Sequence, residues 1–234
     1  MWRALRILGA LDVFQGWGNY QRCCEERGVQ CEGFDLRLGH DCTSPKGRIT
    51  FKRMARRCRR GSVALIGPPC QYYIFLTRSR HGKTIRHPSG NRSKFSKQGN
   101  AIARFVAWAV RLCSMWEISW VIEQPQTSVL FYNRYLRAEL RRNGGKRVHW
   151  RMGVVGGSTP KPSVGWFSSP TAASQFQSRT QALFKAQAKR RRQSEFAYTR
   201  GAKGDVRGNG LTKRSSRYPK RFCKLILQCH GIGP

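Results

Sequence analysis

The chain has 234 residues, of which 39% are hydrophobic, and it carries a formal net charge of +34. This length is enough for one sizeable core, and seven Trp and twelve Phe argue against a wholly disordered chain. No apolar run approaches the ~20 residues that span a bilayer, and no apolar stretch with a cleavage site follows the N-terminus, so we expect no membrane contact and no secretory signal.

The nine cysteines do not predict a disulfide framework. Their number is odd, their spacing is irregular, and no Cys-x-x-Cys pair is present. We interpret them as reduced, mostly buried thiols of an intracellular protein. The usual zinc spacing is also missing, so we expect no metal site.

The positive charge is unevenly distributed. Between Asp41 and Glu117 the chain has no acidic residue but seventeen Lys and Arg. A surface without counter-charge repels itself, which favours a polyanionic partner, and nucleic acid is the obvious one. The alternative is a solvated, charge-rich surface.

The first elements follow the order of a nucleotide-binding unit. Residues 3–14 predict a strand, residues 16–18 a glycine turn, residues 19–27 a helix and residues 29–34 a second strand. Strand, glycine turn, helix, strand and a terminal acidic residue form the first half of a βαβ unit.

The turn itself reads Phe14-x-Gly16-x-Gly18, and the acidic residue is Asp35. Glycines let the backbone approach a ligand closely, and an acid about twenty residues on can hold ribose hydroxyls. The third glycine of the dinucleotide pattern is replaced by Gln21, which argues against a pyrophosphate-containing cofactor. Asp12 suits a cofactor with an amino-acid end. An ordinary strand-to-helix turn is the alternative.

The middle of the chain continues the alternation. We expect a basic helix over 49–60, a buried strand over 63–66, a long surface loop over 71–96, a helix over 100–116 and a strand over 120–122.

Late strands follow at 147–155 and 164–167, expected as an antiparallel pair after a helix over 128–143. From Thr171 the composition becomes more basic. We therefore divide the chain into a domain over 1–170 and a basic, partly disordered extension over 171–234. Helical composition returns at 172–188 and some order over 211–228, where Tyr218, Phe222, Leu225 and Ile226 are available to dock. Residues 189–192 are a block of positive charges. It is either a nuclear import signal, which would place the protein in the nucleus, or only a solvated run of charges.

Two further strand ends carry reactive side chains. Gly67-Pro68-Pro69-Cys70-Gln71 directly follows a strand, and cationic surroundings can lower a thiol pKa from about 8.5 and make it reactive. Glu123 ends the strand over 120–122 and is one of only eleven acidic residues. The alternatives are a core cysteine beside a rigid turn and a salt bridge from Glu123 to an arginine.

Together these motifs resemble the DNA cytosine-5 methyltransferase family. They are similar in order and spacing to its cofactor, Pro-Cys-Gln and Glu-Asn-Val motifs. A closer resemblance is to the methyltransferase-like proteins expanded in dinoflagellate algae, over most of the chain to about Phe167 and loosely over 211–227. The residues that carry it are Leu11 to Gly18, Gly67 to Gln71, Trp120 to Pro125, Ser128, Gln98-Gly99-Asn100 and Lys161-Pro162.

The resemblance implies an α/β, Rossmann-like fold that binds S-adenosyl-L-methionine, with a mostly parallel sheet and a late antiparallel strand. It implies that Cys70 attacks carbon six of a flipped cytosine in DNA, or less readily in RNA, that Glu123 contacts the ring near nitrogen three, and that Arg151 contacts the target base. The implied cofactor-binding residues are Asp12, Phe14, Gly16, Trp17, Gly18, Asp35 and Pro68.

Three departures keep a second reading open. Gln124-Pro125 replaces Asn-Val, only the basic segment from Thr171 is available as a target-recognition region, and Gln98-Gly99-Asn100, similar to the last family motif, precedes Glu123 and is interpreted as a helix start. The alternative to an active enzyme is a catalytically silent nucleic-acid-binding module on a methyltransferase scaffold. The oligomeric state is left open.

Overall fold

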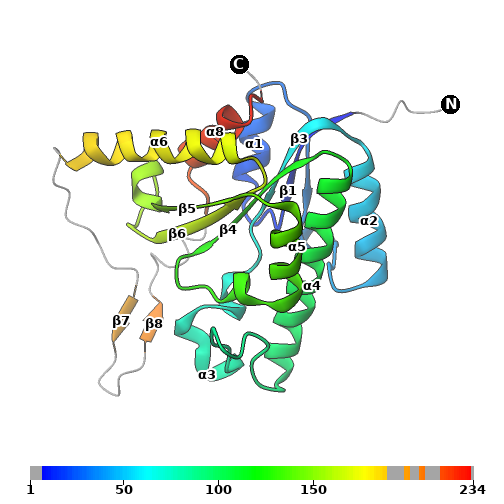
Figure 1. Ribbon diagram of the computed structural model, residues 1–234, viewed down its shortest axis with the longest axis vertical. Coiled ribbons are helices and arrows are strands. Elements are labelled where there is room, and N and C mark those ends of the chain that lie inside the picture. The colour runs from blue at the N-terminus through cyan, green and yellow to red at the C-terminus, as the bar shows by residue number, and fades with distance from the viewer. Residues whose placement is uncertain (1–6, 189–197, 201–205, 209–216, 233–234) are drawn as a thin grey trace.

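The computed structural model describes residues 7–188, 198–200, 206–208 and 217–232. In this part of the chain a six-stranded sheet lies between two layers of helices (Figure 1). The strands of this sheet are β1 Leu8–Val13, β2 Cys31–Phe34, β3 Cys58–Ile66, β4 Ser119–Pro125, β5 Lys146–Arg151 and β6 Pro162–Phe167. The helices are α1 Asn19–Glu25, α2 Pro45–Arg56, α3 Arg78–His81, α4 Lys94–Met115, α5 Arg134–Asn143, α6 Pro170–Ala188 and α8 Lys220–Cys229.

The strand order is β2-β1-β3-β4-β6-β5. The first four strands pair in parallel, whereas β6 is antiparallel to both β4 and β5. Strand β1 therefore lies inside the sheet, and β2 forms the edge next to it. The chain then crosses to the other side of β1 for β3 and β4, and the antiparallel β6 lies between β4 and the edge strand β5. The prediction of a Rossmann-like, mostly parallel α/β fold with a late antiparallel strand is confirmed.

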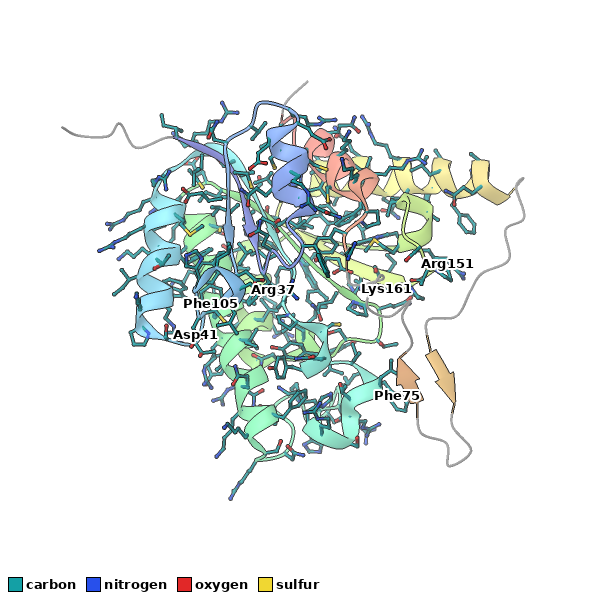
Figure 2. The ribbon with its side chains drawn as sticks, turned by 180° about the vertical axis from the view of Figure 1, so that it is seen from behind. Arg37, Asp41, Phe75, Phe105, Arg151 and Lys161 are labelled. Carbon is teal, nitrogen blue, oxygen red and sulfur yellow. The ribbon has the colours of Figure 1, made fainter. Side chains whose placement is uncertain are left out.

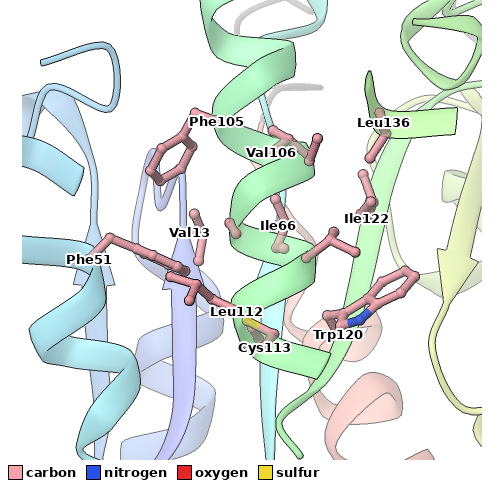
Figure 3. Packing of buried hydrophobic residues seen from close by; sticks show 14 of the residues in the cluster. Val13, Phe51, Ile66, Phe105, Val106, Leu112, Cys113, Trp120, Ile122 and Leu136 are labelled. Carbon is pink, nitrogen blue, oxygen red and sulfur yellow. The ribbon is translucent and has the colours of Figure 1, made fainter. Parts of the chain in front are cut away.

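One face of the sheet is covered by α2, α4 and α5 (Figure 1). Helix α4 begins where the side chain of Ser93 accepts a hydrogen bond from the Ser96 N–H, which caps the helix. Its apolar residues recur at helical spacing, and Phe105 and Cys113 are fully buried against the sheet (Figure 3). Phe105 packs on Phe51 of α2, with ring centroids 5.3 Å apart.

The other face is covered by α1, α6 and α8. Phe176 of α6 and Phe222 of α8 are fully buried and pack around Trp150 of β5, with ring centroids 5.0 and 5.7 Å away. The predicted division at residue 170 falls at the start of α6, and both helices beyond it share the core of the sheet. Of the stretch 211–228 that was expected to regain order, residues 211–216 lie outside the described residues, and α8 docks on the sheet with Leu225 and Ile226 buried.

The segment expected as a loop over 71–96 is more ordered than predicted. It contains short 3-10 helices at Cys70–Tyr72 and Phe75–Thr77 and the helix α3. Lys83, 2% exposed, donates to Asn100 and lies 5.0 Å from the ring centre of Tyr73. A buried lysine with these partners fixes the segment against α4, and burial lowers the pKa of Lys83 to about 8.

Several predicted boundaries are wrong. The helix expected over 128–143 begins at Arg134, and the strand expected over 147–155 ends at Arg151. Helix α4 begins at Lys94, so residues 98–100 lie inside the helix and do not start it. The helix expected over 49–60 ends at Arg56, because residues 58–60 already belong to β3, where Cys58 pairs with Leu8 of β1.

All nine cysteines are unpaired thiols, and seven of them are buried. No helix within the described ranges is long and apolar enough to cross a bilayer. Strands β7 Tyr198–Arg200 and β8 Val206–Gly208 form a separate antiparallel pair. The charge block over 189–192 lies outside the described residues.

Candidate functional site

The predicted site residues gather at one edge of the sheet. Strands β1, β2, β3 and β4 run in parallel, so their carboxyl ends meet there. The glycine turn follows β1, Asp35 follows β2, Cys70 follows β3, and Glu123 lies near the end of β4. In open α/β sheets this edge is where ligands bind.

The glycine turn adopts left-handed backbone at three positions. The φ angles of Phe14, Gly16 and Gly18 are 62°, 57° and 67°. Asp35 holds the turn, because its Oδ2 accepts a hydrogen bond from the Gly16 N–H at 3.1 Å, while its Oδ1 accepts from the Arg37 N–H at 2.9 Å. Positive φ is costly for Phe14 and free for glycine, so the turn is a specific structure rather than a loose connection.

Asp12 lies beneath this turn and is 1% exposed. Its Oδ2 accepts the Gln21 N–H at 3.2 Å, in the first turns of α1. Burial raises the pKa of Asp12 to about 8, and the charge of Asp35 adds to the rise while the Gln21 hydrogen bond opposes it. At neutral pH Asp12 is therefore mostly protonated.

Gln15 occupies the inside of the turn. Its Nε2 donates to Gln21 Oε1, and a Cβ atom on Gly33 or Gly18 would collide with its amide. These two glycines therefore make room for a side chain of the protein itself. The sequence pattern gave no sign of this, since position 15 is a free position of the motif.

Cys70 begins a short 3-10 helix directly after Pro69. The backbone before it is held from β4, because Gln124 Nε2 donates to the Pro68 carbonyl at 2.6 Å. Ser128 Oγ in turn donates to Gln124 Oε1 at 2.9 Å. The residue that departs from the family motif, Gln124, thus positions the loop that carries the thiol.

Glu123 is 4% exposed, and its two oxygens have different surroundings. Oε2 accepts a hydrogen bond from the Tyr218 hydroxyl at 3.0 Å. Oε1 lies 3.5 Å from Lys161 Nζ, in an ion pair, and makes no hydrogen bond within the described ranges. A buried carboxylate needs such partners. We call Cys70, Glu123, Lys161 and Tyr218 the Cys70 cluster.

The charges of this cluster act on the thiol. Burial raises the pKa of Cys70; the ammonium of Lys161 lowers it and the carboxylate of Glu123 raises it further. The balance of these effects favours the protonated thiol. Lys161 is the cation that favours the thiolate.

Tyr218 reaches the site from the residues before α8. Its hydroxyl lies against Gly67, where a Cβ atom would collide with it, and its carbonyl accepts a hydrogen bond from the Asn19 side chain. The neighbouring Arg217 lies over the ring of Trp17, 3.7 Å from its centre, and Arg37 lies over the same ring at 5.4 Å. Residues 217 and 218 thus connect the glycine turn with Glu123.

Arg151 is exposed at the end of β5 and lies near Lys161, which directly precedes β6 (Figure 2). Its register partner is Pro162, and it lines a groove against α6. The structure brings together Cys70, Glu123 and the glycine turn, and it places Arg151 on the rim.

Sequence reasoning assigned no role to Lys161 or Tyr218. Lys161 was visible only within the shared Lys161-Pro162 pair, and Tyr218 only as an aromatic residue available to dock. Both reach the site through contacts with residues far away in the sequence.

No family model and no curated protein matches this chain. Among solved structures, the chain is similar to the Entamoeba histolytica methyltransferase EhMeth, with 14% sequence identity and a TM-score of 0.44. The match covers 71% of this chain and 54% of the Entamoeba protein, so the chain spans about half of that protein's length.

Proposed function

We propose that the chain is an S-adenosyl-L-methionine-dependent methyltransferase that acts on carbon five of cytosine in DNA. The observation that carries this proposal is the meeting of Cys70 and Glu123 beside the glycine turn, with Lys161 acting on both. A thiol, a buried carboxylate and a cation are the groups needed to add a nucleophile to a pyrimidine ring and stabilise the charge that develops.

The glycine turn and Asp35 fit the nucleoside part of the cofactor. Gly16 is exposed and presents backbone without a side chain. Asp35 Oδ2 accepts one hydrogen bond from the turn and Oδ1 accepts one from the Arg37 N–H, which leaves a lone pair on each oxygen for ribose hydroxyls. When bound, the cofactor supplies a methyl group activated by a sulfonium centre. Phe14, Trp17, Gly18 and Pro68 border the same edge.

The protein's own groups would act on the base as follows. Cys70 loses its proton to water, and its sulfur forms a bond to carbon six, which moves an electron pair toward carbon five. Glu123 holds the ring edge near nitrogen three through Oε1, the oxygen that lies next to Lys161 and accepts no hydrogen bond from Tyr218. After carbon five has gained the methyl group it releases its proton to a base, and the bond from sulfur to carbon six breaks. The thiolate of Cys70 is thereby restored.

A base must leave the duplex to reach this site, which costs a few kcal/mol. The segment after Cys70 offers binding groups for this step. Phe75 is 67% exposed (Figure 2), and Arg78 and Arg80 follow it in α3. An apolar group flanked by cations suits an unstacked step in a nucleic acid. A DNA substrate would also agree with the nuclear location predicted from residues 189–192.

The proposal is tested with labelled S-adenosyl-L-methionine and DNA, followed by digestion to nucleosides. We expect labelled 5-methylcytosine from the natural chain and none from Cys70→Ser. Protein that binds the cofactor and DNA but yields no labelled nucleoside would contradict the proposal. Label in another nucleoside would keep methyl transfer and overturn the cytosine target.

The second candidate is a silent nucleic-acid-binding module. The observation that favours it is Gln15, whose amide fills space between Gly18 and Gly33 inside the turn. It predicts DNA affinity with a steep salt dependence, with a slope of about −0.9 per phosphate contact, and no heat on titration with the cofactor. Affinity that barely changes with salt would argue against it.

A further inference from the structure

A hollow lies beside the Cys70 cluster. It is a groove of about 370 Å³ between the edge strand β5, the start of β6 and the helix α6. Its lining residues are Gln126, His149, Trp150, Arg151, Val154, Pro162, Thr180, Gln181, Phe184 and Lys185.

Phe184 is the unusual residue of this groove. Helix α6 buries Phe176 completely against Trp150, but Phe184, eight residues later, leaves 52% of its surface exposed. A large aromatic side chain at the wall of a groove offers a flat surface on which a ring can stack.

The charge of the groove points to an anionic occupant. Arg151 and Lys185 are both exposed in its lining, and none of the ten lining residues is acidic. The amides of Gln126 and Gln181 add donors and acceptors. The indole N–H of Trp150 is buried and has no hydrogen-bond partner within the described ranges. Cations, amides and an aromatic ring together match the chemistry of a nucleotide.

The groove adjoins the candidate active site at the start of β6, where Pro162 of the groove follows Lys161 of the Cys70 cluster. The Gln126 N–H donates to the Pro162 carbonyl at 3.0 Å, and Pro162 pairs with Arg151 in the sheet. Lys161, directly before Pro162, forms the ion pair with Glu123. A strand that places one base at Glu123 therefore reaches the groove with its neighbouring nucleotides.

We propose that this groove binds an unstacked nucleotide next to the target base, with its ring on Phe184 and its phosphate on Arg151 and Lys185. The proposal rests on the proposed function for the identity of the target, and it assigns Arg151 to the flanking strand rather than to the reacting base. The ligand chemistry is that of a nucleic-acid strand, DNA or RNA.

The test measures binding of a labelled single-stranded oligonucleotide by fluorescence anisotropy, without cofactor, over a range of salt concentrations. We expect Phe184→Ala to weaken binding about tenfold, because the base loses its stacking partner, with an unchanged salt slope. The double variant Arg151→Gln/Lys185→Gln should lower the salt slope by about 0.7, because it removes the contact with one phosphate of a single strand.

Two matched variants control for surface changes. Ile49→Ala removes an exposed apolar side chain (53% exposed) from α2, and Arg147→Gln removes an exposed charge from the other end of β5. Ile49→Ala should bind like the natural chain, and Arg147→Gln should keep its salt slope. Losses at Phe184 and at Arg151/Lys185 that do not exceed those of the controls would overturn the proposal.

Two further arms separate the proposals. Phe184→Ala is tested with a DNA strand and with an RNA strand. A loss of affinity for either strand, or for both, supports the groove and identifies the nucleic acid that it binds. No loss for either strand overturns the proposal. If the groove variants lose affinity as expected but the natural chain transfers no methyl group, only the proposed function is contradicted. Methyl transfer that is unaffected in Phe184→Ala, with unchanged binding, would contradict the groove alone.

Discussion

The two sides of the candidate site are assembled over different distances along the chain. The glycine turn is held by neighbours, since Asp35 lies 19 residues from Gly16 and Gln21 lies nine residues from Asp12. The Cys70 cluster is held by residues far away in the sequence, since Gln124 lies 56 residues from Pro68 and Tyr218 lies 95 residues from Glu123. A local motif can therefore reveal the first side, whereas the second exists only when the sheet and α8 are complete.

The largest expected effect concerns the sulfur on the distant side. Cys70→Ser should lower methyl transfer by at least about a thousandfold, because a hydroxyl is a far weaker nucleophile than a thiolate. Cofactor affinity, set by the turn, should stay unchanged. Labelled product and calorimetry measure the two quantities, and Cys58→Ser, which changes a partly buried thiol at the start of β3, is the control. Equal losses of methyl transfer in Cys70→Ser and Cys58→Ser would contradict a specific role of the Cys70 cluster in the reaction.

The second effect concerns Asp12 on the local side. The folded chain keeps its proton up to about pH 8, whereas an unfolded chain releases it near pH ~4. Stability should therefore fall as pH rises between these values, by up to about 1.4 kcal/mol per pH unit.

Asp12→Asn keeps an acceptor for the Gln21 N–H and removes this dependence. The variant should be more stable than the natural chain at pH 8 and similar to it near pH 4, as measured by denaturant unfolding. Glu117→Gln, in an exposed ion pair with Arg60, is the control. A variant less stable than the natural chain at pH 8 would show that Asp12 is ionised in the fold.

The third effect tests the link between the sides. Tyr218→Phe removes the hydroxyl from Glu123 Oε2 and leaves a buried carboxylate oxygen without its donor, which should cost about 1–3 kcal/mol of stability. Tyr135→Phe, an exposed residue whose hydroxyl contacts Arg134, should cost less than about 0.5 kcal/mol. Equal free energies of unfolding for the two variants would contradict the hydrogen bond from Tyr218 to Glu123.

The smallest expected effect is a shift in thiol ionisation. Lys161→Met should raise the pKa of Cys70, whereas Glu123→Gln should lower it, because the two charges act in opposite directions. Alkylation of Cys70 at a series of pH values, read by peptide mass spectrometry, measures both shifts. Cys58 is the internal reference, since burial raises its pKa to about 12.

Lys146→Met, which removes a lysine that contacts Ser174 at the opposite end of the sheet, controls for the loss of one positive charge. It should leave the midpoint at Cys70 in place. Shifts of the same sign in Lys161→Met and Glu123→Gln would contradict the arrangement of charges in the Cys70 cluster.

Much of the fold was predictable, because continuous apolar runs mark the buried parallel strands and α4 has a clear apolar face. The segment over 71–96 was not, since its order comes from Lys83 and Tyr73, whose contacts with α4 leave no periodic signal. The place of α8 in the core was visible only as apolar residues within a basic stretch.

In the candidate site, the strand-end and turn positions could be predicted from the sequence, whereas the residues that contact Glu123 could not. Glycine, proline and strand-end carboxylates have recognisable spacing, so Gly16, Cys70 and Glu123 could be named. Lys161 and Tyr218 are single residues in unremarkable surroundings, and only the antiparallel pairing of β6 and the packing of α8 bring them to Glu123. Arg151 was assigned to the target base, and the structure places it at the rim beside Phe184.

The most direct test of the central claim, that both sides form one cofactor-dependent site, is a calorimetric titration with S-adenosyl-L-methionine. We predict saturable binding of one molecule per chain, retained in Cys70→Ser and weakened in Asp35→Ala, which loses the acid that holds Gly16. Absence of any binding heat at several temperatures, in folded protein, would contradict the account.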